Sequence, residues 1–244
     1  RSLAAILERG LKDRITYVLE KSARAFLVQG SLLLRAKGDH AGAKRAFDQG
    51  ASMGLRLAHF PLGEAPRRQW DYYFSLCDAL LACQFDAANT IATSIFSKEL
   101  PSASDYLEWR YGFAMLLASV VLCDLKTFEL VRKEVNLADE KEKVKGVSWW
   151  VRHGSYIELW HAILLNDAEE FSSQLRACHQ GFAARAKDKS LDDVALEDGG
   201  CENNEYVVDY MALAALILAR HQGLAVDFDS PYVPMGYIRF VEQG

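Results

Sequence analysis

The feature that most constrains this chain is a unit that occurs four times. In each copy an apolar stretch with helical periodicity ends in a very short polar turn that contains an aspartate, and a second amphipathic helix follows. The turn aspartates are Asp39, Asp86, Asp124 and Asp167, at separations of 47, 38 and 43 residues. Helical-hairpin repeats run from about 34 to about 47 residues per unit. The spacing therefore predicts four helical hairpins.

The expected hairpin helices cover 31–39 with 41–53, 73–85 with 87–96, 111–123 with 125–135, and 156–166 with 168–182. Each turn aspartate is expected to cap the second helix by accepting its free backbone N–H groups. One hairpin cannot bury both of its apolar faces, so the hairpins must stack. We predict an all-α fold of stacked antiparallel hairpins. It resembles a degenerate tetratricopeptide-like array in architecture only, because the strict signature of that family is absent.

The chain is interpreted as one domain, 1–244, with four parts. An N-terminal helical region covers 1–37, the stacked hairpins cover 38–186, an acidic loop covers 187–205, and a last helix with an extended tail covers 206–244. Gly30 marks a point where the first helix could break. Gly223 is placed as the C-cap of the last helix. Pro231 and Pro234 predict an extended tail, because proline disfavours helix in the residue before it.

Composition narrows the classes of function. The formal net charge is −5 with a pI near 5.7, which argues against a general nucleic-acid binder. The five cysteines are odd in number and lack metal-ligand spacing, so we expect buried free thiols in a reducing bacterial cytoplasm. The longest apolar runs, 113–123 and 211–219, are too short to span a bilayer, and no membrane association is expected.

Candidate catalytic and metal-binding residues are few. His153, Glu158 and His161 are close in sequence, but H-E-x-x-H is absent, and we interpret them as surface or core residues rather than metal ligands. Cys77, Cys83 and Cys123 are placed on apolar helix faces, where burial raises a thiol pKa. With no nucleophile elbow and no phosphate loop, we expect no enzymatic activity, metal or cofactor. An enzyme site assembled from distant positions stays open as an alternative.

Aromatic residues form two runs, one containing Trp70, Tyr72, Tyr73 and Phe74, the other Trp149 and Trp150. Adjacent residues on a helix point about 100° apart, so we expect that neither run lies wholly in the core. One interpretation is that one side packs and the other makes contacts between hairpins. The alternative is that the other side is exposed and anchors a partner, since tryptophan and tyrosine are enriched in binding hot spots. Trp149 is the candidate anchor.

An acidic segment concentrates the net charge. Residues 187–209 contain eight acidic residues and two lysines, and so carry −6, while the whole chain carries −5. The segment could be a solvated loop, or a patch that steers onto a basic partner. A Ca²⁺ site is a third interpretation, although the spacing does not match an EF-hand. The candidate contact residues, besides Trp149, are Asp188, Asp192, Asp193, Glu197, Asp198, Glu202 and Glu205.

The C-terminal part carries a family resemblance. An apolar helix at 206–216 leads into Ala-Arg-His-Gln-Gly at 219–223, followed by Val-Asp-Phe-Asp at 226–229 and Pro-Tyr-Val-Pro at 231–234. This resembles the C-terminal end of the immunity protein 49 family of bacterial polymorphic toxin systems, over residues 193–234. Those proteins are also helical, similar in length and carry tryptophan in their middle helices, which Trp149, Trp150 and Trp160 would suit.

The resemblance implies a non-enzymatic protein that binds one cognate toxin, often a nuclease, and blocks its active site. It carries no individual contact residues to this chain. Our first hypothesis is therefore an immunity protein whose partner is a basic toxin, and the second is a tetratricopeptide-like adaptor that takes a peptide or helix in its concave groove. Neutralising the acidic loop distinguishes the two. Oligomeric state stays open, because exposed aromatics would also suit a homodimer.

Overall fold

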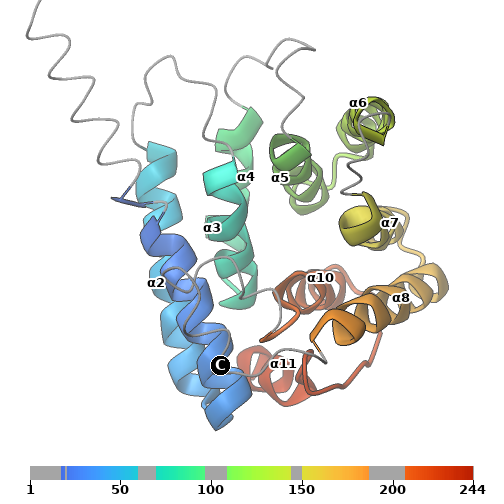
Figure 1. Cartoon of the computed structure of the whole chain (residues 1–244). Coiled ribbons are helices and arrows are strands. Elements are labelled where there is room, and N and C mark those ends of the chain that lie inside the picture. The colour runs from blue at the N-terminus through green and yellow to red at the C-terminus, as the bar shows by residue number, and fades with distance from the viewer. Residues whose placement is uncertain are drawn as a thin grey trace, which may run out of the picture.

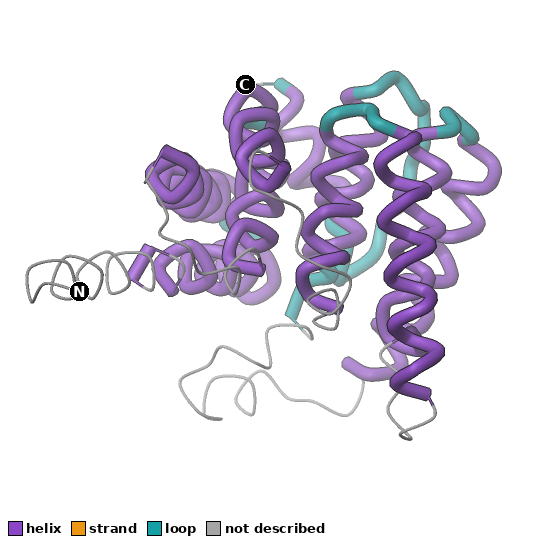
Figure 2. Tube along the Cα trace, turned by 90° about the horizontal axis from the view of Figure 1, so that it is seen from above, coloured by secondary structure: helices purple, strands orange, loops and turns teal. Residues whose placement is uncertain are grey.

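The computed structural model describes residues 18–19, 21–59, 70–96, 109–143, 150–186 and 207–243. The predicted all-α class is confirmed: the described residues form helices, and their one β feature is an isolated bridge between Ser230 and Val233. Figure 2 shows this helical character throughout the described chain. Among the described residues, no helix combines the length and apolarity that crossing a bilayer requires.

The helices follow one another as antiparallel pairs. Residues 21–32 are helical through Gly30, where a break had been considered, and continue into the π-helix η1 (Leu33–Lys37). The later elements are α2 (His40–His59), α3 (Trp70–Leu81), α4 (Phe85–Phe96), α5 (Trp109–Val121), α6 (Leu125–Lys143), α7 (Trp150–Leu164), α8 (Ala168–Ala186), α10 (Tyr210–His221) and α11 (Met235–Glu242).

The four hairpins share one turn. In each turn, the first helix is followed by a residue with positive φ, between 53° and 61°. These residues are Gly38, Cys83, Cys123 and Asn166. In the last three turns the next N–H donates to the carbonyl five residues earlier, at 2.8–3.0 Å. This bond defines the Schellman motif, which satisfies carbonyls that the helix end leaves free. In the first turn the π-helix lengthens the loop, and Asp39 N–H donates to Leu33 O, six residues earlier.

Three of the four predicted aspartate caps are confirmed. Asp39 accepts from Gly42 N at 2.8 Å, Asp124 from Thr127 N at 3.0 Å, and Asp167 from Glu170 N at 2.9 Å. The Thr127 hydroxyl and amide also lower the pKa of Asp124 below its ordinary value.

The prediction for Asp86 is wrong, because α4 already begins at Phe85. Gln84 occupies the position equivalent to the other three aspartates, and its side chain donates to Asp48 Oδ1 at 2.7 Å instead of capping α4. Counted from Asp39 through Gln84 and Asp124 to Asp167, the repeat measures 45, 40 and 43 residues, which is more regular than the spacing of the aspartates suggested.

The first and second hairpins pack closely because α2 presents glycines to α3. A Cβ atom added at Gly50 would overlap the Asp78 side chain, and one at Gly54 would overlap Ser75. The two glycines are four residues apart and therefore lie on one face of α2. Only glycine lets the two helix backbones approach to this separation.

Inner and outer helices of the stack differ in burial. Every described side chain of α3 from Tyr72 onward, and of α5 from Gly112 onward, is buried. The outer helix α6 instead buries a narrow stripe of Phe128, Val131 and Val135. The inner helices are therefore covered on all sides, and a second layer must lie against them.

Helix α10 supplies that second layer. All ten residues 210–219 are buried, and the helix packs against α3, α7 and α8. Figure 1 shows α10 lying between α3 on one side and α7 with α8 on the other. Asp209 caps it by accepting from Ala212 N at 3.0 Å, and the Tyr156 hydroxyl of α7 donates to the same carboxylate at 2.9 Å. Gly223 ends it with φ of 95°, as predicted.

The C-terminal segment connects the two ends of the stack. Tyr232 packs against Phe182 of α8 at 5.2 Å between ring centroids, and Arg35 of η1 lies 4.9 Å from the Tyr232 ring. The predicted tail ends in a short helix that was not predicted, α11, which packs against α2. The Tyr237 hydroxyl of α11 donates to Leu81 O at 2.7 Å, joining this helix to α3 as well.

The corrected turn assignment predicts different costs for two aspartates. Asp124→Ala removes a cap and should lower the free energy of unfolding by about 1 kcal/mol. Asp86→Ala removes only an interaction with the helix dipole and should cost about 0.3 kcal/mol. Urea unfolding followed by circular dichroism measures both. Equal losses would contradict the assignment of Gln84 as the equivalent turn residue.

Candidate functional site

The predicted partner contacts lie outside the described residues. This holds for Trp149 and for all seven acidic residues of the loop: Asp188, Asp192, Asp193, Glu197, Asp198, Glu202 and Glu205. They therefore stay predictions, and the described part of the chain was searched for further sites.

The histidine near Glu158 belongs to an ionic network between α6 and α7. The Arg132 guanidinium donates to both Glu158 oxygens at 2.6 and 2.7 Å and lies 3.3 Å from His161 Nδ1. His161 Nε2 lies 2.7 Å from Glu129, and its ring stacks on Phe128. The Arg132 guanidinium of α6 contacts both candidate ligands, Glu158 and His161 of α7, so the network joins these two helices. His153 has no described side chain, and no group of metal-ligating residues is found among those described.

The cysteines separate into two kinds. Cys77 and Cys178 are buried and form no disulfide, as expected, and burial raises the pKa of Cys77 well above its ordinary value. Cys83 and Cys123 were placed on apolar helix faces, which is wrong: both occupy the positive-φ position of a hairpin turn. Cys83 is half-buried, and burial raises its pKa to about 11, whereas Cys123 is exposed.

The aromatic run at the start of α3 lies wholly in the core as far as it is described. Tyr72, Tyr73 and Phe74 are all buried, which agrees with the interpretation that the run makes contacts between hairpins, and the side chain of Trp70 lies outside the described residues. The reason is that α2, α4, α5 and α10 surround α3 on every side. The described part of this run therefore offers no anchor to a partner.

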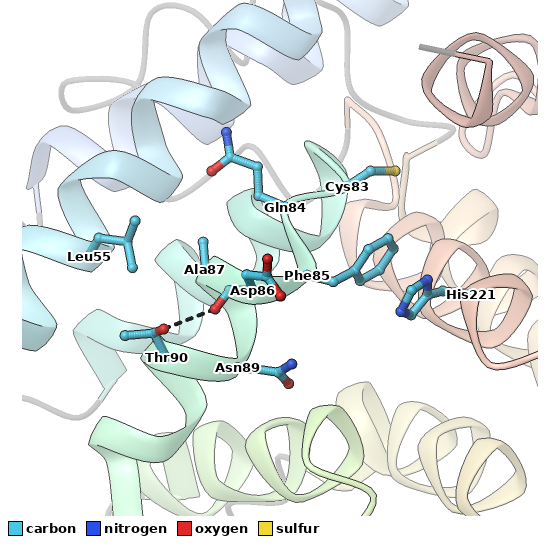
Figure 3. A pocket seen from close by; sticks show the side chains of 9 residues that line it. All are labelled: Leu55, Cys83, Gln84, Phe85, Asp86, Ala87, Asn89, Thr90 and His221. Atoms are coloured by element: carbon cyan, nitrogen blue, oxygen red, sulfur yellow. Dashed lines mark hydrogen bonds between the residues drawn. The ribbon is translucent and has the colours of Figure 1, made fainter.

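A pocket lies where the turn between α3 and α4 meets α2 and α10. Its cavity volume is about 690 Å³, within the range of small-molecule and side-chain sites. We call it the α4 pocket, and its lining residues are Leu55, Cys83, Gln84, Phe85, Asp86, Ala87, Asn89, Thr90 and His221. Figure 3 shows Phe85 and His221 on one side of Asp86, and Leu55 with Thr90 on the other.

The α4 pocket combines a stacked aromatic pair with polar side chains. The rings of Phe85 and His221 are 3.5 Å apart between centroids and inclined by 7°. Asp86 and Asn89 are exposed, and Thr90 Oγ1 donates to the backbone carbonyl of Asp86 at 2.9 Å. The sequence signalled none of this beyond the turn itself, because His221 comes from a helix more than 130 residues away.

A second polar feature is buried in the core. Asp78 of α3 is wholly buried against Gly50, and neither of its carboxyl oxygens has a hydrogen-bond partner within the described chain. Burial raises its pKa well above the ordinary value, which favours the protonated carboxyl in the folded state. Cys77 on α3 and Tyr237 on α11 interact electrostatically with it. A protonated carboxyl buried at a close contact between two helices makes the free energy of unfolding depend on pH.

The raised pKa predicts an unusual pH dependence. Above about pH 4 the unfolded chain releases the Asp78 proton while the folded chain retains it, so the contribution of Asp78 to stability falls as pH rises. Relative to wild type, Asp78→Asn should gain about 1.4 kcal/mol per pH unit from pH 4 towards the raised pKa. Urea unfolding at pH 4.5, 5.5 and 6.5 measures the difference.

Ser75→Ala is the matched control for Asp78→Asn. Ser75 lies on α3 in contact with Gly54, and its buried hydroxyl also lacks a partner within the described residues. Because it does not titrate in this range, its difference from wild type should not change with pH. A pH-independent difference for Asp78→Asn would show that the carboxyl is ionised in the folded protein.

The comparisons with known proteins found no relative. No family model matches the chain, and neither a curated protein nor a solved structure matches it. The resemblance to the immunity protein 49 family therefore rests on the residues of this chain alone.

Proposed function

We propose that this chain is an immunity protein that binds a cognate bacterial toxin and inhibits it by covering the toxin's active site. The observation that carries the proposal is the C-terminal resemblance over 193–234. Within it, residues 210–219 form the buried central helix of the fold. Because the core is closely packed, the helices around α10 must fit its side chains. A resemblance in this segment therefore bears on the arrangement of the surrounding helices as well.

The position of α10 also favours this function over the adaptor. An adaptor of tetratricopeptide type holds its ligand on the inner face of the stack. Here α10 lies against the inner helices α3 and α7, where such a ligand would bind. A partner is therefore expected on the outer surface, as for an inhibitor that covers a catalytic cleft.

Charge supports a basic partner. Residues 187–205 carry −5, which equals the net charge of the whole chain, and the next acid, Asp209, is a buried cap of α10. A concentrated charge raises the association rate with an oppositely charged surface and suppresses wrong partners. We propose that residues 187–205 make the main contact and that Trp149 is a second anchor.

The experiment captures the partner and tests inhibition directly. Tagged protein is used to pull partners from its native bacterium, and each captured protein is expressed alone in a host. We expect one partner that arrests growth when expressed alone, and growth that is restored when this chain is co-expressed. Capture without growth arrest would contradict the proposal.

Two double variants test the acidic segment. Asp192→Asn with Asp193→Asn should weaken binding of the captured toxin by about tenfold at low salt, with a smaller effect at high salt. Glu169→Gln with Glu170→Gln removes the same charge from two adjacent exposed acids of α8 and should change affinity little. Equal weakening by both pairs would mean that only overall net charge matters.

A further inference from the structure

The α4 pocket carries one unbalanced charge. Asp86 is the acidic residue of its lining, which contains no lysine or arginine. Within the described residues the Asp86 carboxylate makes no ion pair, and the Thr90 hydroxyl donates to the backbone carbonyl of Asp86 instead. The nearby Asp48 differs, because it pairs with Lys44 at 3.2 Å and accepts from Gln84. A positively charged ligand would neutralise the Asp86 carboxylate in this pocket.

The shape of the lining selects among cations. The stacked rings of Phe85 and His221 line the pocket, and His221 is exposed. A planar guanidinium packs against aromatic rings and also donates a two-pronged fork to a carboxylate, whereas an ammonium group interacts with aromatic rings but cannot make such a fork. Asn89 adds an acceptor oxygen, and Leu55 with Ala87 offers apolar contact to methylene groups.

Because of the helix dipole, binding of a cation in the pocket requires the charge of Asp86. The pocket lies at the N-terminus of α4, where the dipole is equivalent to about half a positive charge and opposes a bound cation. The full negative charge of Asp86 outweighs that half charge. Without it the same pocket would repel a guanidinium, so its removal should abolish binding.

From these observations we propose that the α4 pocket binds an arginine side chain of a protein partner. The inference deepens the proposed function and rests on it for the identity of the partner, since a toxin of basic surface would present such side chains. The guanidinium would donate to Asp86 in the pocket that the rings of Phe85 and His221 line.

The test uses two small probes and needs no toxin. N-acetyl-arginine amide is titrated into the ¹⁵N-labelled full chain and followed by the amide resonances of 84–90 and 221. N-acetyl-citrulline amide is the control, because it has the same shape with a neutral urea in place of the guanidinium. We expect saturable shifts with the arginine probe and affinity at least about fivefold weaker with citrulline. Equal affinity for both, or no shift with arginine, would overturn the proposal.

Two variants assign the binding to Asp86. Asp86→Asn should abolish the shifts. Glu169→Gln is the matched control, because Glu169 holds the same second helical position in α8 that Asp86 holds in α4, but lies outside the pocket. Both changes remove one acid from a helix N-terminus, so loss of helix stability should be similar. Arginine binding that survives Asp86→Asn would overturn the assignment.

The captured partner then connects the pocket to function. Asp86→Asn should weaken its binding by about fivefold, and Glu169→Gln should not. If the pocket binds arginine but the captured protein is no toxin, the proposed function fails and the pocket assignment stands. If the toxin is inhibited equally by wild type and Asp86→Asn, the proposed function stands and this use of the pocket fails.

Discussion

The burial of α10 against the inner helices is the interaction on which the rest of this structure depends. Helix α10 is apolar on every side, and the described residues of the inner helix α3 from Tyr72 onward are all buried. The packing of α10 against α3, α7 and α8 stabilises the fold by removing apolar surface from water. The N-terminus of α10 is capped at the same contact, where the Asp209 carboxylate accepts hydrogen bonds from Ala212 N and from the Tyr156 hydroxyl.

This arrangement changes what a stack of hairpins can do. An open stack offers its concave face to a ligand. Here the chain fills that face with its own helix and connects the two ends of the stack through Tyr232 and α11. We propose that recognition takes place on the outside, where the lining of the α4 pocket includes Asp86 and a stacked aromatic pair. The proposed immunity function uses the protein as a rigid block with an acidic contact surface, which suits inhibition by covering.

The hairpin turns show where local signals suffice and where they mislead. Asp39, Asp124 and Asp167 were recognised as caps because an aspartate before an amphipathic helix is a local signal. Gln84 was missed because glutamine is no usual cap, and Cys83 was missed because cysteine rarely adopts positive φ. Helix α11 was not predicted because Pro231 and Pro234 indicated an extended tail, although Met235, Ile238 and Val241 repeat at three-residue steps.

The sequence by itself determined the helical class, the four hairpins, most of their caps and the end of α10 at Gly223. These depend on side-chain periodicity and on hydrogen bonds between residues a few positions apart, which a linear pattern contains. Only the tertiary structure decided that the described aromatics of α3 are all buried, that α10 fills the inner face, and that His221 meets Phe85. Such contacts join residues far apart along the chain, and their geometry follows from how the helices pack.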